Sequence, residues 1–261
     1  MVSAAPIAAL AGESGLAHAL LHPACAAFAI SATLGNCAWF GPVVTEFATE
    51  LREVWLTIDD GPDPEDTPRL LDLLDEAGAQ ATFFLIGARA QRYRSLVDEI
   101  VRRGHSLGNH TQTHPTGSFW AAGPHRAQRE IQAAQLSIGH PTSLFRAPVG
   151  MANVFVHRAA GENGLTMIGW SIRSLDTRAC PASIIADRVA EQLAPGRIVI
   201  LHEGHRDTSG RSQHAEILAA TLDKLREGDW RSVIPPRSSW LSRGRPLASP
   251  VNVSQTRAES C

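Results

Sequence analysis

The chain carries two histidines four residues apart, His110 and His114, about fifty residues after the adjacent carboxylates Asp59 and Asp60. Imidazole nitrogens and carboxylate oxygens bind zinc, and a site with three protein ligands keeps one coordination position open for water. Asp60 and the two histidines would supply those ligands, and Asp59 would be left to take a proton from the water. The pattern predicts hydrolytic chemistry at one divalent metal, with Zn²⁺ expected and Co²⁺ as an alternative.

Each half of this pattern also has a simpler reading. Asp59-Asp60-Gly61-Pro62 is good turn sequence, and a chain with eleven histidines can place two of them close together by chance. Histidines at positions i and i+4 would share one face of a helical turn. Thr111 stands where the zinc-protease motif has its glutamate, so the base must come from elsewhere in the chain.

Two further polar residues follow apolar runs. Arg146 could pair with Asp59 through a bidentate contact, which would orient the carboxylate and lower its proton affinity. His202 could donate a proton to a leaving group, with Asp176 as the carboxylate that keeps it charged. An exposed arginine and an ordinary rim histidine are the alternatives. His205 is expected to be a surface residue.

Short apolar runs alternate with longer amphipathic segments from residue 54 onward. Strands are expected at 54–59, 81–86, 105–110, 144–148, 165–170, 197–202 and 230–234, and helices at 67–77, 90–103, 124–138, 153–162, 181–193 and 211–227. This alternation predicts an α/β fold, an incomplete or distorted (β/α) barrel with about seven parallel strands. The candidate residues lie at or just after the carboxyl ends of the strands, which converge on one face of a barrel.

Composition limits the class of protein. A chain of 261 residues fits one large domain, and a net charge of −2 gives no basic face for nucleic acid. The four cysteines form no CxxC pair and are expected as reduced thiols: Cys25, Cys37, Cys180 and Cys261. Residues 1–50 are expected to form an apolar helical leader, 51–235 the catalytic domain, and 236–261 a flexible tail rich in Pro, Ser and Arg.

The leader bears on localisation. No Lys or Arg precedes Arg52, so the positive segment of a secretory signal is missing. The stretch 16–34 is nearly long enough to span a bilayer but is interrupted by Pro23 and several polar residues. A cytoplasmic protein with membrane contact through the leader is the expectation. The sequence does not indicate an oligomeric state.

In order and spacing, these motifs together resemble the polysaccharide deacetylase family with the NodB-homology domain, carbohydrate esterase family 4, over residues 50–235. Five segments carry the resemblance: 57–62 (T-F-D-D-G-P in the family), 110–114 (H-S/T-x-x-H), 146–150 (R-P-P-Y-G), 170–177 (W-S-x-D-x-x-D-W) and 200–202 (L-x-H).

The resemblance implies a metal-dependent hydrolase that removes N-acetyl groups from an amino-sugar oligomer or polysaccharide. It implies a role for each matching residue: Asp59 as base, Asp60, His110 and His114 as metal ligands, Arg146 orienting the base, His202 as acid, Asp176 tuning that acid, the Val149 N–H stabilising the oxyanion, and Trp170 and Ile200 lining the acetyl pocket.

The chain departs from the family pattern on the substrate side. Val149 replaces a tyrosine, Arg173 an acidic residue and Thr177 a tryptophan. These departures leave two alternatives open. One is the same metal site acting on a different linear or cyclic amide, and the other is a catalytically inactive carbohydrate-binding module.

Overall fold

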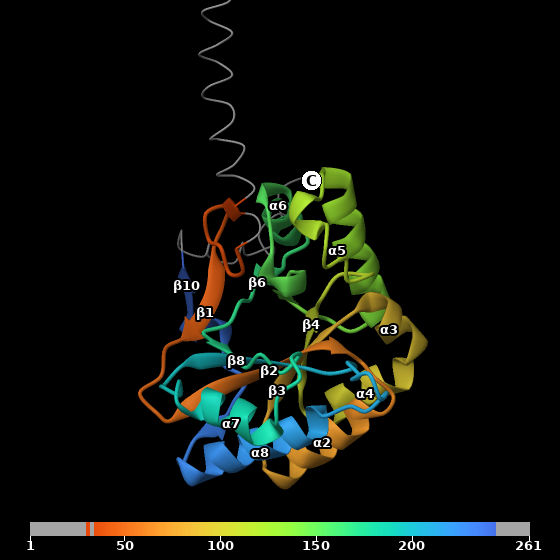
Figure 1. The fold of residues 1–261 in the computed structure, drawn as a ribbon. Helices are drawn as coiled ribbons and strands as arrows, with labels where there is room; N and C mark the ends of the chain where they lie inside the picture. Colours follow the sequence, from red (N-terminus) through yellow and green to blue (C-terminus); the bar gives the residue numbers. More distant parts are fainter. Residues whose placement is uncertain (1–29, 32–33, 244–261) are drawn as a thin grey trace, which may run out of the picture.

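One curled sheet of mostly parallel strands runs through the protein (Figure 1), in a computed structural model that describes residues 30–31 and 34–243. The strand order is β10-β1-β8-β2-β3-β4-β5-β6, with β7 beside β8 and β9 beside β2. The strands are β1 Val43–Phe47, β2 Glu53–Gly61, β3 Ala81–Leu85, β4 Ser106–Asn109, β5 Leu144–Phe145, β6 Thr166–Met167, β7 Ile172–Arg173, β8 Arg197–His202, β9 Arg231–Ser232 and β10 Trp240–Arg243. The expected distorted barrel of parallel strands is confirmed.

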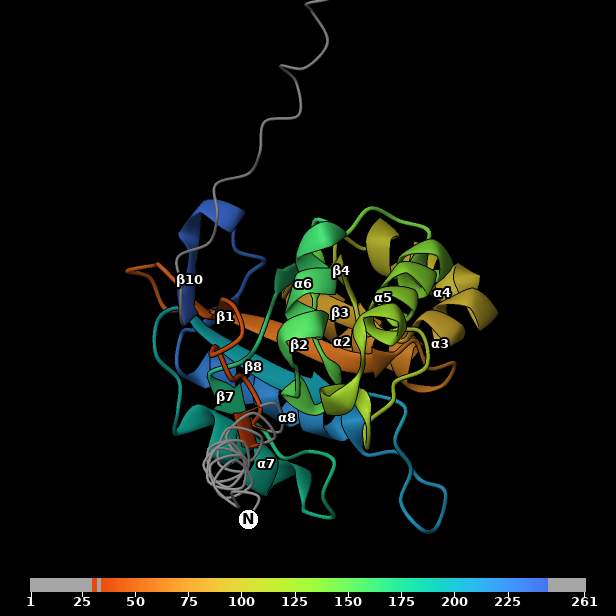
Figure 2. The ribbon, with the colours of Figure 1, turned by 90° about the horizontal axis from the view of Figure 1, so that it is seen from above.

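Helices cover this sheet in two groups (Figures 1 and 2). They are α2 Asp66–Glu76, α3 Gly87–Arg92, α4 Arg94–Arg102, α5 Pro124–Ile138, α6 Val154–Glu162, α7 Ala182–Ala190 and α8 His214–Glu227, with short 3-10 turns at Phe119–Ala121, Pro148–Gly150 and Arg237–Ser239. Helices α2, α4, α7 and α8 share one apolar core with β2, β3 and β8, and α5 and α6 form a second core near β5 and β6.

Strand β2 is the centre of the sheet because its apolar run is buried on both faces, as in parallel sheets covered by helices. Its side chains alternate. Leu56 and Ile58 pack into the core shared with the helices, whereas Trp55 belongs to the cluster on the other face. Thr57 and Asp59 follow Trp55 on that face, so the strand carries polar residues towards its carboxyl end.

Several boundaries differ from those expected. The expected helix at 90–103 is two helices, because the chain departs from helical geometry at Tyr93 (φ −120°, ψ 52°). The last expected strand, 230–234, is reduced to Arg231–Ser232. Cys37 and Cys180 are free thiols, while Cys25 and Cys261 lie outside the described residues.

The expected leader and the expected tail each contribute a strand to the sheet. Strand β10, from the expected tail, pairs antiparallel with β1, from the expected leader (Figure 1). The pairing is anchored by Trp240, which stacks on the buried Trp55 at 5.9 Å and donates its indole N–H to the carbonyl of Pro235. Residues 1–29, 32–33 and 244–261 lie outside the described residues. Within the described ranges, no helix is long and apolar enough to cross a bilayer.

The Trp240 contact predicts a measurable loss of stability. Trp240→Ala should lower the free energy of unfolding by about 1–3 kcal/mol, because it removes an aromatic pair and half-buried apolar area. Leu241→Ala, at an exposed position on the same strand, should change it by no more than about 0.5 kcal/mol. Urea unfolding of both variants tests this, and equal effects would show that the Trp240–Trp55 contact adds no stability.

Candidate active site

A bulge at the end of β2 brings Asp59 and Asp60 into one cavity. In the ladder to β3, Asp59 pairs with Phe84 and Gly61 with Leu85, so Asp60 is an extra residue. Asp60 has φ 75°, a backbone conformation that aspartate adopts more readily than most residues. In a regular strand the two side chains would point to opposite faces, and a bulge re-aims one of them. Both carboxylates consequently line a cavity of about 210 Å³.

Asp60, His110 and His114 converge as a ligand set. One potential ligand atom from each lies within 4.8 Å of the others. Asp60 Oδ1 is 3.0 Å from His114 Nε2 and 3.4 Å from His110 Nε2. This oxygen is buried and accepts no hydrogen bond within the described structure, and a buried acceptor of that kind calls for a missing partner. A divalent cation between these three atoms would be that partner, so the donor set fits the expected metal.

The two histidines are not held by a helical turn, and that expectation is wrong. They lie in a loop after β4, where Thr111 (φ 67°) and His114 (φ 52°) have left-handed backbone conformations. The His114 N–H donates to the Thr111 hydroxyl at 3.1 Å, which closes the loop. His110 Nδ1 lies 2.7 Å from the carbonyl oxygen of Arg146 and must donate to it. That bond leaves Nε2 with a free lone pair facing the ligand cluster.

Arg146 is fully buried and holds Asp59. Its Nη1 donates to Asp59 Oδ1 at 2.6 Å and to the Thr57 hydroxyl at 2.8 Å. Its other nitrogens donate to main-chain carbonyls, Nε to Ile168 at 3.2 Å and Nη2 to Gly169 at 2.7 Å. The expected bidentate contact is therefore wrong, because only one nitrogen reaches the carboxylate. The carbonyls fix the guanidinium, and the guanidinium in turn fixes one oxygen of Asp59.

His202 and Asp176 form the second pair in the cavity. His202 Nδ1 donates to Asp176 Oδ1 at 2.7 Å, and the His202 backbone N–H donates to Oδ2 at 2.7 Å. Ser174 adds a hydroxyl donor to Oδ1 at 2.8 Å. Burial disfavours the imidazolium, but the adjacent Asp176 carboxylate outweighs it and raises the pKa of His202 to about 9. At neutral pH His202 is therefore a charged proton donor.

The residues expected on the substrate side line the same cavity: Val149, Trp170 and Ile200 from the motifs, with Arg173 and Thr177 beside them. A segment from the expected leader supports this wall. The Asn36 N–H donates to the Gly150 carbonyl at 3.2 Å, and its side-chain amide donates to the Trp170 carbonyl at 2.9 Å.

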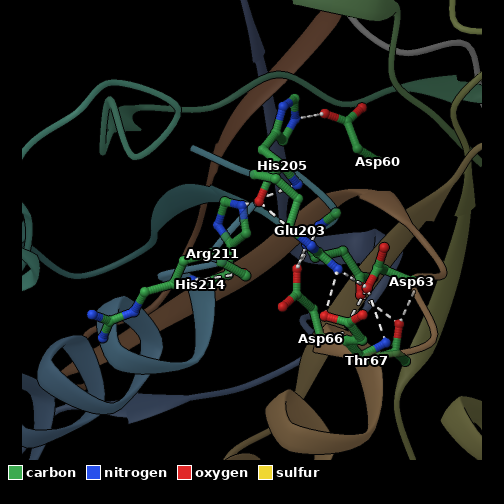
Figure 3. Close-up of polar contacts among 12 residues, drawn as sticks. Asp60, Asp63, Asp66, Thr67, Glu203, His205, Arg211 and His214 are labelled. Atoms are coloured by element: carbon green, nitrogen blue, oxygen red, sulfur yellow. Dashed lines mark hydrogen bonds and ion pairs between the residues drawn. The ribbon is translucent and has the colours of Figure 1, made fainter. Parts of the chain in front are cut away.

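Sequence reasoning missed two polar residues just after His202 (Figure 3). His205 is not merely a surface residue, because its Nε2 lies 2.7 Å from Asp60 Oδ2. Glu203 is completely buried and accepts a hydrogen bond from Thr67. Burial, together with the nearby charges of Asp66 and Asp63, raises the pKa of Glu203 to about 8. The run Leu-His-Glu-Gly-His, with a glycine turn between polar residues at a strand end, was the available signal.

The fold is a distorted barrel of mostly parallel strands, and its cavity holds a candidate three-ligand metal site. Comparison with known proteins gives the family. Residues 48–168 match the family model described as polysaccharide deacetylase. A peptidoglycan-N-acetylglucosamine deacetylase of Bacillus cereus is 36% identical over 200 residues, which cover 74% of this chain and 91% of that protein. A chitooligosaccharide deacetylase of Sinorhizobium fredii is 33% identical over 200 residues, covering 70% and 90%.

Solved structures agree with the sequence matches. The crystal structure of a peptidoglycan N-acetylglucosamine deacetylase superposes with a TM-score of 0.66 at 28% identity, over 72% of this chain and 88% of that chain. The chain belongs to the polysaccharide deacetylase family and is a hydrolase of non-peptide C–N bonds. The family resemblance read from the motifs is confirmed.

The His202–Asp176 pair predicts an unusual titration. In the metal-free protein, NMR of the His202 ring should give a midpoint near pH 9. Asp176→Asn should lower that midpoint by about 1–3 pH units, because the imidazolium loses its counter-charge. Asp98→Asn, which removes a surface partner of His140, should leave it unchanged. An unchanged midpoint in the Asp176 variant would show that this carboxylate does not raise the pKa of His202.

Proposed function

We propose that the protein removes N-acetyl groups from N-acetylglucosamine units of an oligomer or polysaccharide, with one divalent ion held by Asp60, His110 and His114. One observation carries this proposal. Asp59 Oδ1 is held by Arg146, while Asp59 Oδ2 lies 3.7 Å from His110 Nε2, beside the ligand cluster. That oxygen is free to act as a base at the edge of the metal site.

The bound ion would supply Lewis-acid polarisation of a water and of the amide carbonyl. Zn²⁺ fits the set of two imidazoles and one carboxylate, and Co²⁺ is the alternative ion for the same donors. The other steps belong to side chains of the chain itself.

Asp59 takes a proton from the attacking water as a new C–O bond forms at the acetyl carbonyl. The Val149 N–H, on the cavity wall, stabilises the developing oxyanion, and such a donor typically contributes about 10²–10³ in rate. His202 Nε2 gives a proton to the amine as the C–N bond breaks, because an unprotonated amide nitrogen leaves poorly. The products are acetate and a free amino sugar. Trp170 and Ile200 hold the acetyl methyl group.

The names of the relatives support the choice of substrate, since they are deacetylases of peptidoglycan N-acetylglucosamine and of chitooligosaccharides. A second substrate class, another linear or cyclic amide, is favoured by Val149 and Arg173, which line the cavity where the family motif has a tyrosine and an acidic residue. A panel of chitooligosaccharides, peptidoglycan fragments and small N-acetyl amides separates the two.

Asp59→Asn gives the sharpest test of the chemistry. The variant should bind Zn²⁺ like the wild type, because Asp60 and both histidines remain, but its turnover should fall by about 10²–10⁴-fold for want of a base. Acetate release from N-acetylglucosamine oligomers, with metal removed and then restored, measures both requirements.

Asp98→Asn is the matched control, since it makes the same change in an exposed carboxylate. The turnover of both variants should be compared at a temperature at which both proteins are fully folded. Near-normal turnover in folded Asp59→Asn protein would show that Asp59 is not the base. Wild-type activity that does not depend on metal would show that the reaction does not need the ion.

A further inference from the structure

We propose that His205 is a positioning residue for the metal ligand Asp60: it holds Oδ2 so that only Oδ1 is presented to the ion. The inference rests on the proposed metal site and assigns His205 a part in it. Asp60 is a carboxylate with two oxygens in different surroundings. Oδ1 faces the two ligand histidines, and Oδ2 lies 2.7 Å from His205 Nε2 (Figure 3).

The chemistry of this contact is fixed by the acceptor. A carboxylate binds a metal ion in its ionised form, and an ionised carboxylate can only accept hydrogen bonds. His205 Nε2 must therefore carry the proton. Within the described residues, His205 is the one partner of this carboxylate outside the ligand set. Its removal would leave the side chain at a backbone bulge without a lateral restraint.

The turn at Gly204 holds the backbone next to His205 in place. Gly204 has φ 75°, a conformation that most residues avoid, and its N–H donates to Asp66 Oδ2 at 2.8 Å. A β-carbon at Gly204 would collide with the guanidinium of Arg89, which itself donates to the Asp60 main-chain carbonyl at 2.7 Å. The turn and the bulge are thus packed against each other.

Three more contacts hold the turn in place. The backbone N–H of His205 donates to Nε2 of the buried His214 at 3.3 Å. Arg206 forms ion pairs with Asp66 at 3.0 Å and with Asp63 at 2.8 Å, which tie the turn to the start of α2. The imidazole of His205, with 46% of its side chain exposed, is therefore placed by its main chain rather than by burial.

The consequence is an open coordination shell. A carboxylate free to turn could offer both oxygens to the ion and fill the position that a water needs. With Oδ2 engaged, Asp60 contributes a single oxygen. Hydrogen-bond partners of metal ligands typically change metal affinity by about 10–100-fold when they are removed.

Zn²⁺ affinity, measured by competition with a chromophoric chelator, tests this role without using activity. The wild type is measured first. His205→Ala should bind Zn²⁺ about 10–100-fold more weakly. His205→Gln, whose amide nitrogen can reach the place of Nε2, should recover most of that loss. His125→Ala, at an exposed histidine in the first turn of α5, is the control and should match the wild type. The visible spectra of the Co²⁺-loaded wild type and Gln variant should coincide.

The outcomes separate this inference from the proposed function. Wild-type affinity in His205→Ala would overturn the positioning role and leave the metal site intact. A changed Co²⁺ spectrum in His205→Gln, with no recovery of affinity, would make His205 a ligand of the ion and overturn the role as stated. A wild-type protein that binds no metal would end both proposals.

Discussion

Two carboxylates, Asp59 and Asp60, are buried side by side at the end of one strand, and the rest of the site is organised around that fact. Adjacent buried negative charges are costly unless each has its own partner. The fully buried guanidinium of Arg146 forms an ion pair with Asp59 and balances its charge. The charge of Asp60 is balanced by contacts with histidines and, in the proposed function, by a cation. The bulge at Asp60 makes the arrangement sterically available, since an unbroken strand would separate the two side chains.

The sheet provides the remaining parts because parallel strands end on the same side. The two carboxylates lie at the end of β2, His110 and His114 lie in the loop after β4, and His202 lies at the end of β8. Asp59 and His202 are direct partners in the β2–β8 ladder, which fixes the proposed base and acid relative to each other through main-chain hydrogen bonds. The substrate wall is less rigidly determined by strands. Val149, Trp170 and Thr177 lie outside the strands, and Asn36 bonds to the backbone of this wall, so specificity can change there while the chemistry is kept.

The sequence predicted this framework well where local pattern and global fold agree. The apolar run 54–58 followed by two aspartates identified the central strand and its functional end. Details that depend on packing between distant segments were not predictable. Arg146 makes a single contact with Asp59 because its other nitrogens donate to the carbonyls of Ile168 and Gly169. The loop that joins the two histidines depends on left-handed backbone conformations at Thr111 and His114. The pairing of β1 with β10 depends on Trp240 reaching Trp55, and His205 owes its place to a turn anchored on α2.

Crystals grown with Zn²⁺ and measured on both sides of the zinc absorption edge would test the central claim most directly. The proposed metal site predicts one anomalous peak about 2.0–2.2 Å from Asp60 Oδ1, His110 Nε2 and His114 Nε2, with Asp59 outside the ligand set and a position open towards it. No peak between those three atoms, or a peak at which Asp59 closes the shell as a fourth ligand, would contradict it.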